Sequence, residues 1–294
     1  MKHVFIVNRI SGQGLAFSLV DIIKEICERK KLDYVIEISE YQGAVKDIVP
    51  GYNHMDDVTF YSVGGDGTFL EVLNSMDNRH PVAVIPGGSG NDFYRSFYGV
   101  ASDFRSLIEK TIDVEPVTID CGQSADMKFA NTNSAGVDAQ MSYDAVQIIR
   151  KTPIPKGPAY GLSIIYNAIV LKSVKVNMTV DGKDMSGEYY AINCMNGRYY
   201  GNGVKCAPAS EMDDGLFDLV LVPKAARLKI YGTLIKYLKG IATEKDGVRT
   251  IRCKDVVVDS LNGKFAVQTD GENYRTSHLE AHILPAYLKI KIAK

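Results

Sequence analysis

Three glycine-rich segments in the first third of the chain are suited to holding phosphate groups. They are VNRISGQG (7–14), VGGDGT (63–68) and PGGSGND (86–92), and each adjoins an apolar run. Backbone N–H groups in such turns bind anions, and glycine lets the backbone approach a ligand closely. None contains the G-x-x-x-x-G-K-[ST] pattern, so these segments do not form a Walker loop. One such turn alone is commonly a tight strand-to-helix connection, but three of them indicate a ligand site.

Asp66 lies in the middle of the second segment, where its negative charge would repel a phosphate. A divalent cation would resolve this conflict, because a carboxylate can then share one site with metal and phosphate, directly or through water. We therefore expect Asp66 to be needed for the use of metal-bound nucleotide far more than for folding.

The elements that must position these segments alternate along the first third of the chain. Short apolar runs predict strands at 3–7, 34–39, 58–63 and 81–86, and the stretches 16–31, 43–49 and 68–76 predict helices. This alternation indicates a three-layer α/β domain with a parallel sheet, in which ligands bind at the carboxyl ends of the strands. All three glycine-rich segments fall at that edge.

A change of pattern near residue 117 predicts a second domain. Strand-like runs separated by Gly, Asn and Asp turns indicate an antiparallel β-sandwich, with helices at about 138–150, 159–172 and 224–240. We expect an α/β domain over 1–121, a β-sandwich domain over 122–284, and a strand within 285–294 that can return to the first domain.

The net charge of −1 conceals an asymmetry between the halves of the chain. Residues 1–144 hold 12 Lys and Arg against 21 Asp and Glu, whereas residues 145–294 hold 22 against 14. The basic half can face an anionic membrane surface, carry a solvated face, or complement the acidic half. The helix at 224–240 is either an ordinary amphipathic helix on the sandwich or a basic interfacial helix.

Other patterns exclude several classes of protein. The five scattered cysteines indicate neither a zinc site nor a disulfide framework and fit a reducing cytoplasm. No run of about 18 apolar residues occurs, so we expect any membrane contact to be peripheral. No nucleic-acid-binding motif is present. His278 and His282 have the spacing of two metal ligands on a helix, but the alternation around them predicts a strand.

The segments GGDGTFLEVLN and PGGSGNDFYRS together resemble the catalytic domain of the diacylglycerol kinase and sphingosine kinase family, most closely its small bacterial lipid-kinase branch. NRISG matches the family's N-P-x-S-G motif, with Arg9 in place of proline. EMDDGLFDLVLV (211–222) and VQTDGE (267–272) resemble two further motifs of the second domain. The resemblance covers nearly the whole chain, with the motifs in the expected order.

This resemblance implies a lipid kinase with an active-site cleft between an ATP-binding domain and a β-sandwich domain. In it, the γ-phosphate of ATP would pass to a lipid hydroxyl, and we expect diacylglycerol to be converted to phosphatidic acid. The family's nucleotide-binding positions correspond here to Asn8, Ser11, Gly12, Ser39, Gly64, Gly65, Asp66, Gly67, Thr68, Glu71, Asn74, Gly87, Gly88, Ser89, Asn91 and Asp92.

The resemblance also assigns roles in the second domain. Asp214, with main-chain carbonyls of Glu211 and Leu216, would hold a structural Mg²⁺, an ion that prefers oxygen ligands. The alternative is a simple turn followed by a solvated Asp218.

Asp270 and Glu272 are two residues apart, and on an extended chain they would point the same way. One of them would accept the proton of the lipid hydroxyl, and we favour Asp270 while leaving Glu272 open. Without the family pattern, TDGEN is an ordinary surface turn.

Two other functions share part of this pattern. An NAD kinase also has a G-G-D-G-T loop and an α/β domain with a β-sandwich, although PGGSGNDFYRS and the D-G-E segment argue against it. A nucleotide-binding regulatory protein would keep the loops without transferring phosphate. We expect a cytoplasmic lipid kinase at the inner face of the membrane, with peripheral contact to an anionic surface.

Overall fold

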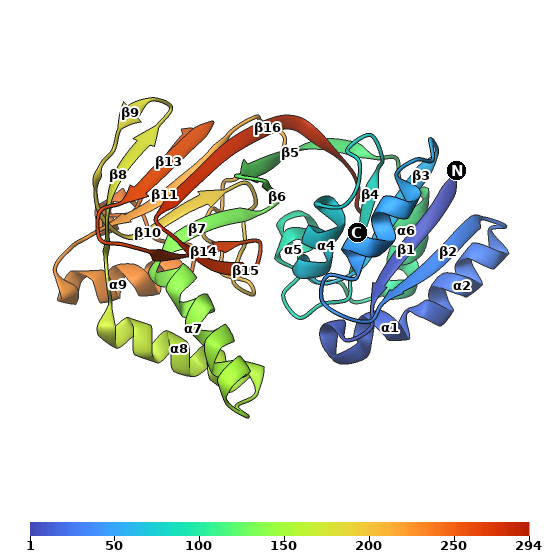
Figure 1. The fold of residues 1–294 in the computed structure, drawn as a ribbon, viewed down its shortest axis with the longest axis horizontal. Coiled ribbons are helices and arrows are strands. Elements are labelled where there is room, and N and C mark those ends of the chain that lie inside the picture. Colours follow the sequence, from blue (N-terminus) through green and yellow to red (C-terminus); the bar gives the residue numbers. More distant parts are fainter. Residues whose placement is uncertain (294) are drawn as a thin grey trace. The chain divides into compact units, whose positions relative to one another are not determined.

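The computed structural model describes residues 1–293, apart from the side chains of Lys156, Arg227, Leu228, Lys229, Leu234 and Leu238. The chain divides into two compact units, whose elements are labelled in Figure 1. The first unit comprises Met1–Cys121 with Pro285–Lys294, and the second comprises Gly122–Leu284. No helix in the described part of the chain is long and apolar enough to cross a membrane.

The first unit is built on a parallel sheet of short apolar strands. Its order is β2–β1–β3–β4, and Val4 of β1 pairs with Val35 on one side and Phe60 on the other. The five central residues of β1 are all buried, as expected for a strand covered on both faces. The strands are β1 (Lys2–Asn8), β2 (Asp33–Ser39), β3 (Val58–Gly64) and β4 (Val82–Pro86).

Helices cover this sheet. Phe5 and Tyr61 pack against Ile23 of α2 and Ile108 of α6 in one apolar core. Helix α4 packs on β3, and its Phe69 contacts the ring of Phe93 in α5. The helices are α1 (Leu15–Ser18), α2 (Val20–Arg29), α3 (Val45–Ile48), α4 (Asp66–Leu73), α5 (Asp92–Tyr98) and α6 (Phe104–Asp113), with 3-10 turns at Ser11–Gly14 and Val49–Tyr52.

Strand β16 (His278–Lys291) belongs to both units. Its first residues pair antiparallel with β13, as in the pair His278 and Asp259. Its last residues, Ile290 and Lys291, pair in parallel with Val82 and Ala83 of β4. The chain therefore completes the sheet of the first unit after it has formed the second.

Antiparallel pairs make up the second unit. The hydrogen-bonded order is β15–β14–β7–β10–β8–β13–β16, and β11 pairs with both β10 and β12. The strands are β5 (Val117–Ser124, shared with the first unit), β6 (Met127–Phe129), β7 (Thr132–Gly136), β8 (Val174–Val180), β9 (Lys183–Asp184), β10 (Gly187–Met195), β11 (Phe217–Pro223), β12 (Arg249–Cys253), β13 (Asp255–Ser260), β14 (Phe265–Thr269) and β15 (Glu272–Thr276).

Strands β10 and β11 separate two apolar cores of the second unit. Ile192 and Leu219 face a core formed between strands, whereas their neighbours Ala191 and Val220 face a core that includes Ile230 of α9. This division follows from the alternation of side chains along a strand. Figure 1 shows α7 (Val137–Lys151), α8 (Lys156–Val170) and α9 (Arg227–Leu238) along one side of these strands. The predicted combination of an α/β domain and an antiparallel β domain is confirmed.

The sequence predicted the main strands of the first unit to within one residue at each end, but its helices less well. The helix predicted over 16–31 is two helices separated at Leu19, and the helix predicted over 43–49 is a single α-helical turn followed by a 3-10 turn. Helix α6 was not predicted. Its Asp103 N-cap accepts a hydrogen bond from the Ser106 N–H, which is a recognisable start signal.

Candidate active site

The three glycine-rich segments meet at the carboxyl end of the first unit's sheet, where β1, β3 and β4 end. The Gly87 N–H donates to the Gly64 carbonyl oxygen at 2.8 Å, which joins the third loop to the second. The Asn8 side-chain amide donates to the Thr68 hydroxyl at 3.1 Å, which joins the first loop to the second. The loops form one connected group.

Close packing between the loops accounts for several of their glycines. A Cβ on Gly12 would lie 2.3 Å from the Gly87 carbonyl oxygen, and one on Gly88 would lie 2.3 Å from the Gly65 Cα. Gly12 also has a φ of 61°, which favours glycine. These glycines let the loops contact one another, a role that the sequence did not reveal.

Asp66 fastens the second loop to the third. One carboxylate oxygen accepts the Asp92 N–H and the other accepts the Phe93 N–H, each at 3.0 Å. These N–H groups begin α5 and have no acceptor within the helix, and a helix N-terminus carries partial positive charge. The charge that looked misplaced in GGDGT is therefore met by the start of a neighbouring helix. A role of Asp66 towards metal stays a prediction.

Two asparagines shape their own loops. The Asn8 side-chain oxygen accepts the N–H groups of Ile10 and Ser11, and that of Asn91 accepts the Gly88 N–H at 3.0 Å. The predicted nucleotide-binding residues at this edge of the sheet are Asn8, Ser11, Gly12, Ser39, Gly64, Gly65, Asp66, Gly67, Thr68, Gly87, Gly88, Ser89, Asn91 and Asp92.

Glu71 and Asn74 lie farther along α4. The Glu71 carboxylate accepts the Gly43 N–H at 3.2 Å and therefore faces the segment after β2. Asn74 is the C-cap of α4, and its amide donates to the Leu70 carbonyl oxygen. Because a helix rises about 1.5 Å per residue, Asn74 lies about 12 Å from the start of α4. Asn74 therefore lies at the opposite end of α4 from the second loop, and its role towards nucleotide stays a prediction.

The D-G-E segment forms the turn between β14 and β15. Thr269 pairs with Glu272 across the hairpin, which leaves Asp270 and Gly271 as a two-residue turn with φ values of 43° and 97°. Positive φ at both positions is typical of tight hairpin turns. The expectation that Asp270 and Glu272 point the same way on an extended chain is therefore wrong, because the turn lies between them.

The two carboxylates of this hairpin have different surroundings. Asp270 is buried, and its oxygens accept the backbone N–H groups of Ala130, Asn131 and Thr132 at 2.6–3.2 Å. Glu272 is exposed. Ala130–Thr132 was not expected as the partner of the D-G-E segment, although the polar run N-T-N-S at 131–134 was a usable signal.

The D-D-G loop offers oxygen ligands of the kind that Mg²⁺ prefers, but its carboxylate already has partners. One oxygen of Asp214 accepts the Leu216 N–H at 3.0 Å, and the other is paired with the Arg252 guanidinium. A carboxylate and the carbonyls of Glu211 and Leu216 suit the ion chemically. The Arg252 guanidinium would compete with Mg²⁺ for the Asp214 carboxylate, because the guanidinium and the ion are both positively charged.

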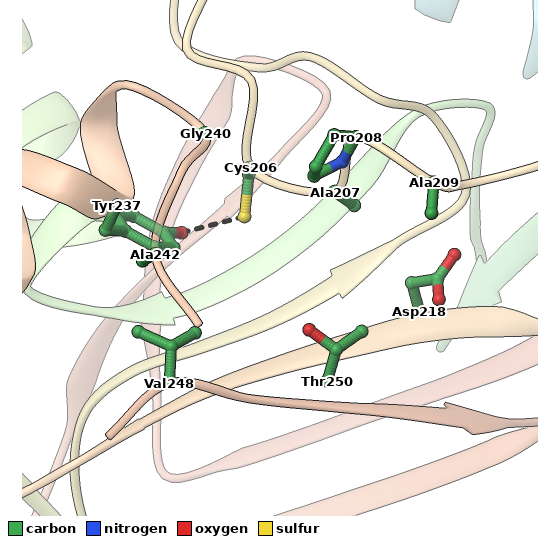
Figure 2. A pocket seen from close by; sticks show the side chains of 10 residues that line it. All are labelled: Cys206, Ala207, Pro208, Ala209, Asp218, Tyr237, Gly240, Ala242, Val248 and Thr250. Carbon is green, nitrogen blue, oxygen red and sulfur yellow. Dashed lines mark hydrogen bonds between the residues drawn. The ribbon is translucent and has the colours of Figure 1, made fainter. Parts of the chain in front are cut away.

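A cavity of about 180 Å³ adjoins the strand that follows this loop. Figure 2 shows Asp218, Tyr237, Cys206 and Thr250 among its lining residues, with the Tyr237 hydroxyl 2.9 Å from the Cys206 sulfur. Asp218 is only 8% exposed, and burial raises its pKa. The alternative interpretation of Asp218 as a solvated residue of the strand that follows the turn is therefore wrong.

Asp138, near the start of α7, is a further carboxylate of this unit whose oxygens are buried. Burial raises its pKa to about 6, against the opposing influence of Tyr200 and Asn193. Tyr200 and Asn193 both contact the Tyr237 hydroxyl, so Asp138 adjoins the polar group beside the cavity.

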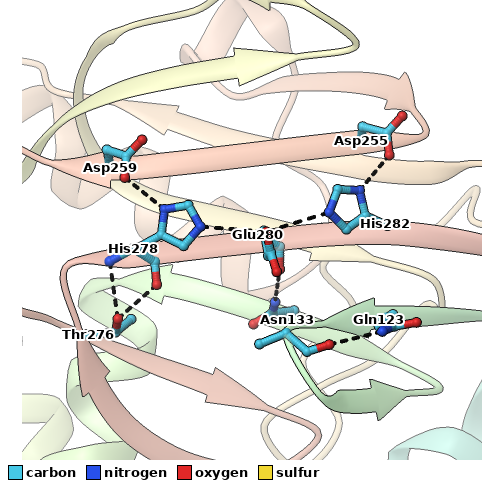
Figure 3. A network of polar contacts seen from close by, with 9 residues as sticks. Gln123, Asn133, Asp255, Asp259, Thr276, His278, Glu280 and His282 are labelled. Carbon is cyan, nitrogen blue, oxygen red and sulfur yellow. Dashed lines mark hydrogen bonds and ion pairs between the residues drawn. The ribbon is translucent and has the colours of Figure 1, made fainter.

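His278 and His282 lie on β16, as the predicted strand requires. Figure 3 shows Asp259 and Asp255 each 2.7 Å from the Nδ1 of one histidine, while both Nε2 atoms face Glu280 at 3.6 and 3.7 Å. The hydrogen bond with Asp259 raises the pKa of His278. Among the described residues, no group of three His, Cys, Asp or Glu side chains is arranged to hold a metal ion.

Comparison with known proteins decides the family. The diacylglycerol kinase catalytic domain matches residues 2–124, and the YegS C-terminal NAD kinase beta sandwich-like domain matches residues 131–292. The chain belongs to the diacylglycerol kinase-like family of lipid kinases. The predicted family resemblance is confirmed.

Individual members of this lipid kinase family align with the chain at low identity. A diacylglycerol kinase of Bacillus subtilis is 29% identical, over 72% of this chain and 70% of the relative. A diacylglycerol kinase of Staphylococcus epidermidis is 27% identical, over 72% of this chain and 66% of the relative. A crystal structure described as a diacylglycerol kinase of Bacillus anthracis has a TM-score of 0.74 and 20% identity, covering 99% of this chain and 97% of that one. This last likeness supports the fold.

Replacing Asp66 should disturb the lipid kinase site more than the fold. We expect Asp66→Ala to lower the free energy of unfolding by about 1–2 kcal/mol, as for the loss of a helix cap. ATP-dependent turnover should fall by more than about tenfold, because the second and third loops lose the two hydrogen bonds through which Asp66 joins them. Urea unfolding and a kinase assay measure the two effects.

A matched control is Asp103→Ala, which removes the cap of α6 at Ser106, outside the three loops. It should cost similar stability and leave turnover unchanged. Equal turnover in the two variants would show that Asp66 is only a helix cap.

Removing the guanidinium beside Asp214 tests the predicted Mg²⁺ site of the D-D-G loop. We expect Arg252→Met to raise the Mg²⁺ affinity by about tenfold, because an attached cation no longer competes for the carboxylate. Titration calorimetry without nucleotide measures this affinity. Asp214→Asn should abolish the same heat, and an unchanged Mg²⁺ affinity in both variants would place the ion elsewhere.

Ionisation of Asp138 should make the second unit less stable as the pH rises. Since the folded pKa of about 6 exceeds the unfolded value of 3.8, the unfolded chain binds fewer protons between these values, and the free energy of unfolding falls across this window. Asp138→Asn should make this dependence smaller than in the wild type, because Asp218 still contributes to it, and should add about 1–3 kcal/mol at pH 7. Urea unfolding at pH 4 and pH 7 tests it. An equal difference in stability between pH 4 and pH 7 in the wild type and the variant would contradict the assignment.

Proposed function

We propose that this protein transfers the γ-phosphate of ATP to the hydroxyl of a lipid alcohol, converting diacylglycerol to phosphatidic acid. The connected group of three glycine loops at the carboxyl end of a parallel sheet carries this proposal. Membership of the lipid kinase family supports the class of acceptor. Free cysteines at all five positions fit a cytoplasmic location, and we place the reaction at the inner face of the membrane.

The chain's own residues would position the nucleotide. Phosphoryl transfer needs alignment and neutralisation of charge more than covalent chemistry by the protein. Backbone N–H groups of the second and third loops supply polar donors, and the Asp66 bonds fix the distance between these loops. Mg²⁺ bound with ATP would supply neutralisation of the phosphate charge. Asp214 and the main-chain carbonyls of Glu211 and Leu216 would hold a separate, structural Mg²⁺ in the D-D-G loop.

The two carboxylates of the D-G-E hairpin would divide the work of proton removal. Glu272 is exposed and can meet an incoming hydroxyl. The oxygens of Asp270 accept three backbone N–H groups, which fixes the turn that presents Glu272. The different surroundings of the two carboxylates support Glu272 as the general base and Asp270 as its positioning residue. The sequence had favoured the reverse assignment.

A lipid panel tests the proposed activity directly. Purified protein, labelled ATP and Mg²⁺ are incubated with diacylglycerol, sphingosine and monoacylglycerol in mixed micelles, with NAD in a parallel tube. We expect label in phosphatidic acid. Label in NAD with none in any lipid would assign the chain to the NAD kinase activity instead, and ATP binding without any labelled product would indicate a regulatory protein.

Substitutions in the hairpin separate the two carboxylate roles. Glu272→Gln should reduce kcat by about 10²- to 10⁴-fold, the contribution of a general base, with unchanged stability. Asp270→Asn should cost about 1–3 kcal/mol of stability, because its amide cannot accept from all three N–H groups.

The pH profile of kcat distinguishes the base from its positioning residue. The acidic limb should vanish in Glu272→Gln and persist in Asp270→Asn. The opposite pattern, with near-normal turnover in Glu272→Gln, would make Asp270 the base.

A further inference from the structure

Helix α8 has the reverse of the usual distribution of side chains for a surface helix. The face that packs on α7 carries Ala159, Ser163 and Asn167, all buried and spaced four residues apart. The Ser163 hydroxyl donates to the Met141 carbonyl oxygen at 2.6 Å, and the Asn167 amide donates to the Asp144 carboxylate at 2.9 Å. Small and polar groups therefore hold α8 to its neighbour.

The outward face of α8 is apolar. Leu162, Ile165, Tyr166 and Ile169 recur at the spacing of one helical stripe, and Ile165 and Ile169 are 60% and 67% exposed. A surface helix ordinarily turns such a stripe towards the core. Here the stripe lacks a covering element among the described residues of the chain.

Helix α9 extends this face. The Tyr231 hydroxyl donates to the Ala168 carbonyl oxygen at 3.1 Å, which places α9 beside α8. Tyr231 and Ile235 are exposed large apolar side chains of α9. We call the combined face the α8–α9 apolar surface, and it comprises Leu162, Ile165, Tyr166, Ile169, Tyr231 and Ile235.

The segments that carry this surface have an excess of basic residues, although Lys224 pairs with Glu188 and Lys236 with Asp246. Residues 145–172 contain four Lys and Arg, residues 224–241 contain five, and neither segment contains an Asp or Glu, in a chain whose net charge is −1. Lys172 and Lys239 are among the exposed side chains. Apolar and aromatic groups bordered by cations are typical of a helix that lies in the headgroup region of an anionic bilayer.

We propose that the α8–α9 apolar surface inserts into the interface of an anionic phospholipid bilayer. The charge argues against a second copy of the chain as the occupant, because a symmetric dimer would bring two basic surfaces together. The inference rests on the proposed function in one respect, namely that the acceptor lipid is presented in a membrane.

A tryptophan reporter tests insertion directly, because the chain contains no tryptophan. Tyr166→Trp places a single indole on the surface. With phosphatidylcholine vesicles containing phosphatidylglycerol and no ATP, its emission should shift to shorter wavelength and be quenched by brominated acyl chains. Emission that is unchanged by bound vesicles would overturn the proposal.

Paired substitutions test the contribution of the surface to binding. Ile165→Ser with Ile169→Ser should weaken sedimentation with these vesicles by at least about tenfold. The control, Val100→Ser with Leu261→Ser, removes two exposed apolar side chains elsewhere and should bind as the wild type does. Equal vesicle binding by the two double variants would overturn the proposal.

Two further measurements separate this inference from its alternatives. A concentration-dependent dimer in analytical ultracentrifugation, abolished by the Ile165 and Ile169 changes, would assign the surface to a second copy and overturn the proposal. In the Ile165→Ser, Ile169→Ser variant, turnover should be unchanged on dispersed short-chain diacylglycerol. Its turnover should be reduced only on diacylglycerol presented in vesicles. Vesicle binding as expected without lipid phosphorylation would reject the proposed function and retain the insertion surface.

Discussion

The two hydrogen bonds from the start of α5 to the Asp66 carboxylate control the geometry of the candidate active site. They join loops that follow β3 and β4, and they place a negative charge where a helix offers unpaired N–H groups. The Gly12, Gly65, Gly87 and Gly88 contacts then close the remaining space between loops. The loops are therefore positioned by one another as well as by the strands that precede them.

Periodicity was sufficient to predict the architecture, because both domains follow simple patterns of burial. Strands covered on both faces are continuous apolar runs, as in β1, and the turns between antiparallel strands carry Gly, Asn and Asp. The glycine segments could be placed at the ligand-binding edge for the same reason. What the sequence could not supply was the partner of each polar group, since Asp66 and Phe93, or Asp270 and Ala130, are far apart along the chain.

The D-G-E hairpin and Asn74 show how local conformation redirects a functional prediction. Two residues of positive φ are enough to turn Asp270 away from the direction of Glu272 and into a set of backbone N–H groups. Asn74 lies about two helical turns beyond Asp66, at the C-terminal end of α4. In both cases the residue type indicated a polar role. The position of the side chain depended on backbone dihedral angles, which the sequence pattern did not show.

Strand β16 determines the order in which the protein can be completed. During synthesis, residues 285–293 emerge after the whole second unit, yet they supply the strand beside β4 in the first. Until then, β4 presents an unpaired edge, which is a known route to wrong association between chains. The sheet of the first unit is therefore completed only after the second unit has been synthesised, and a chain truncated before residue 285 would leave the β4 edge open.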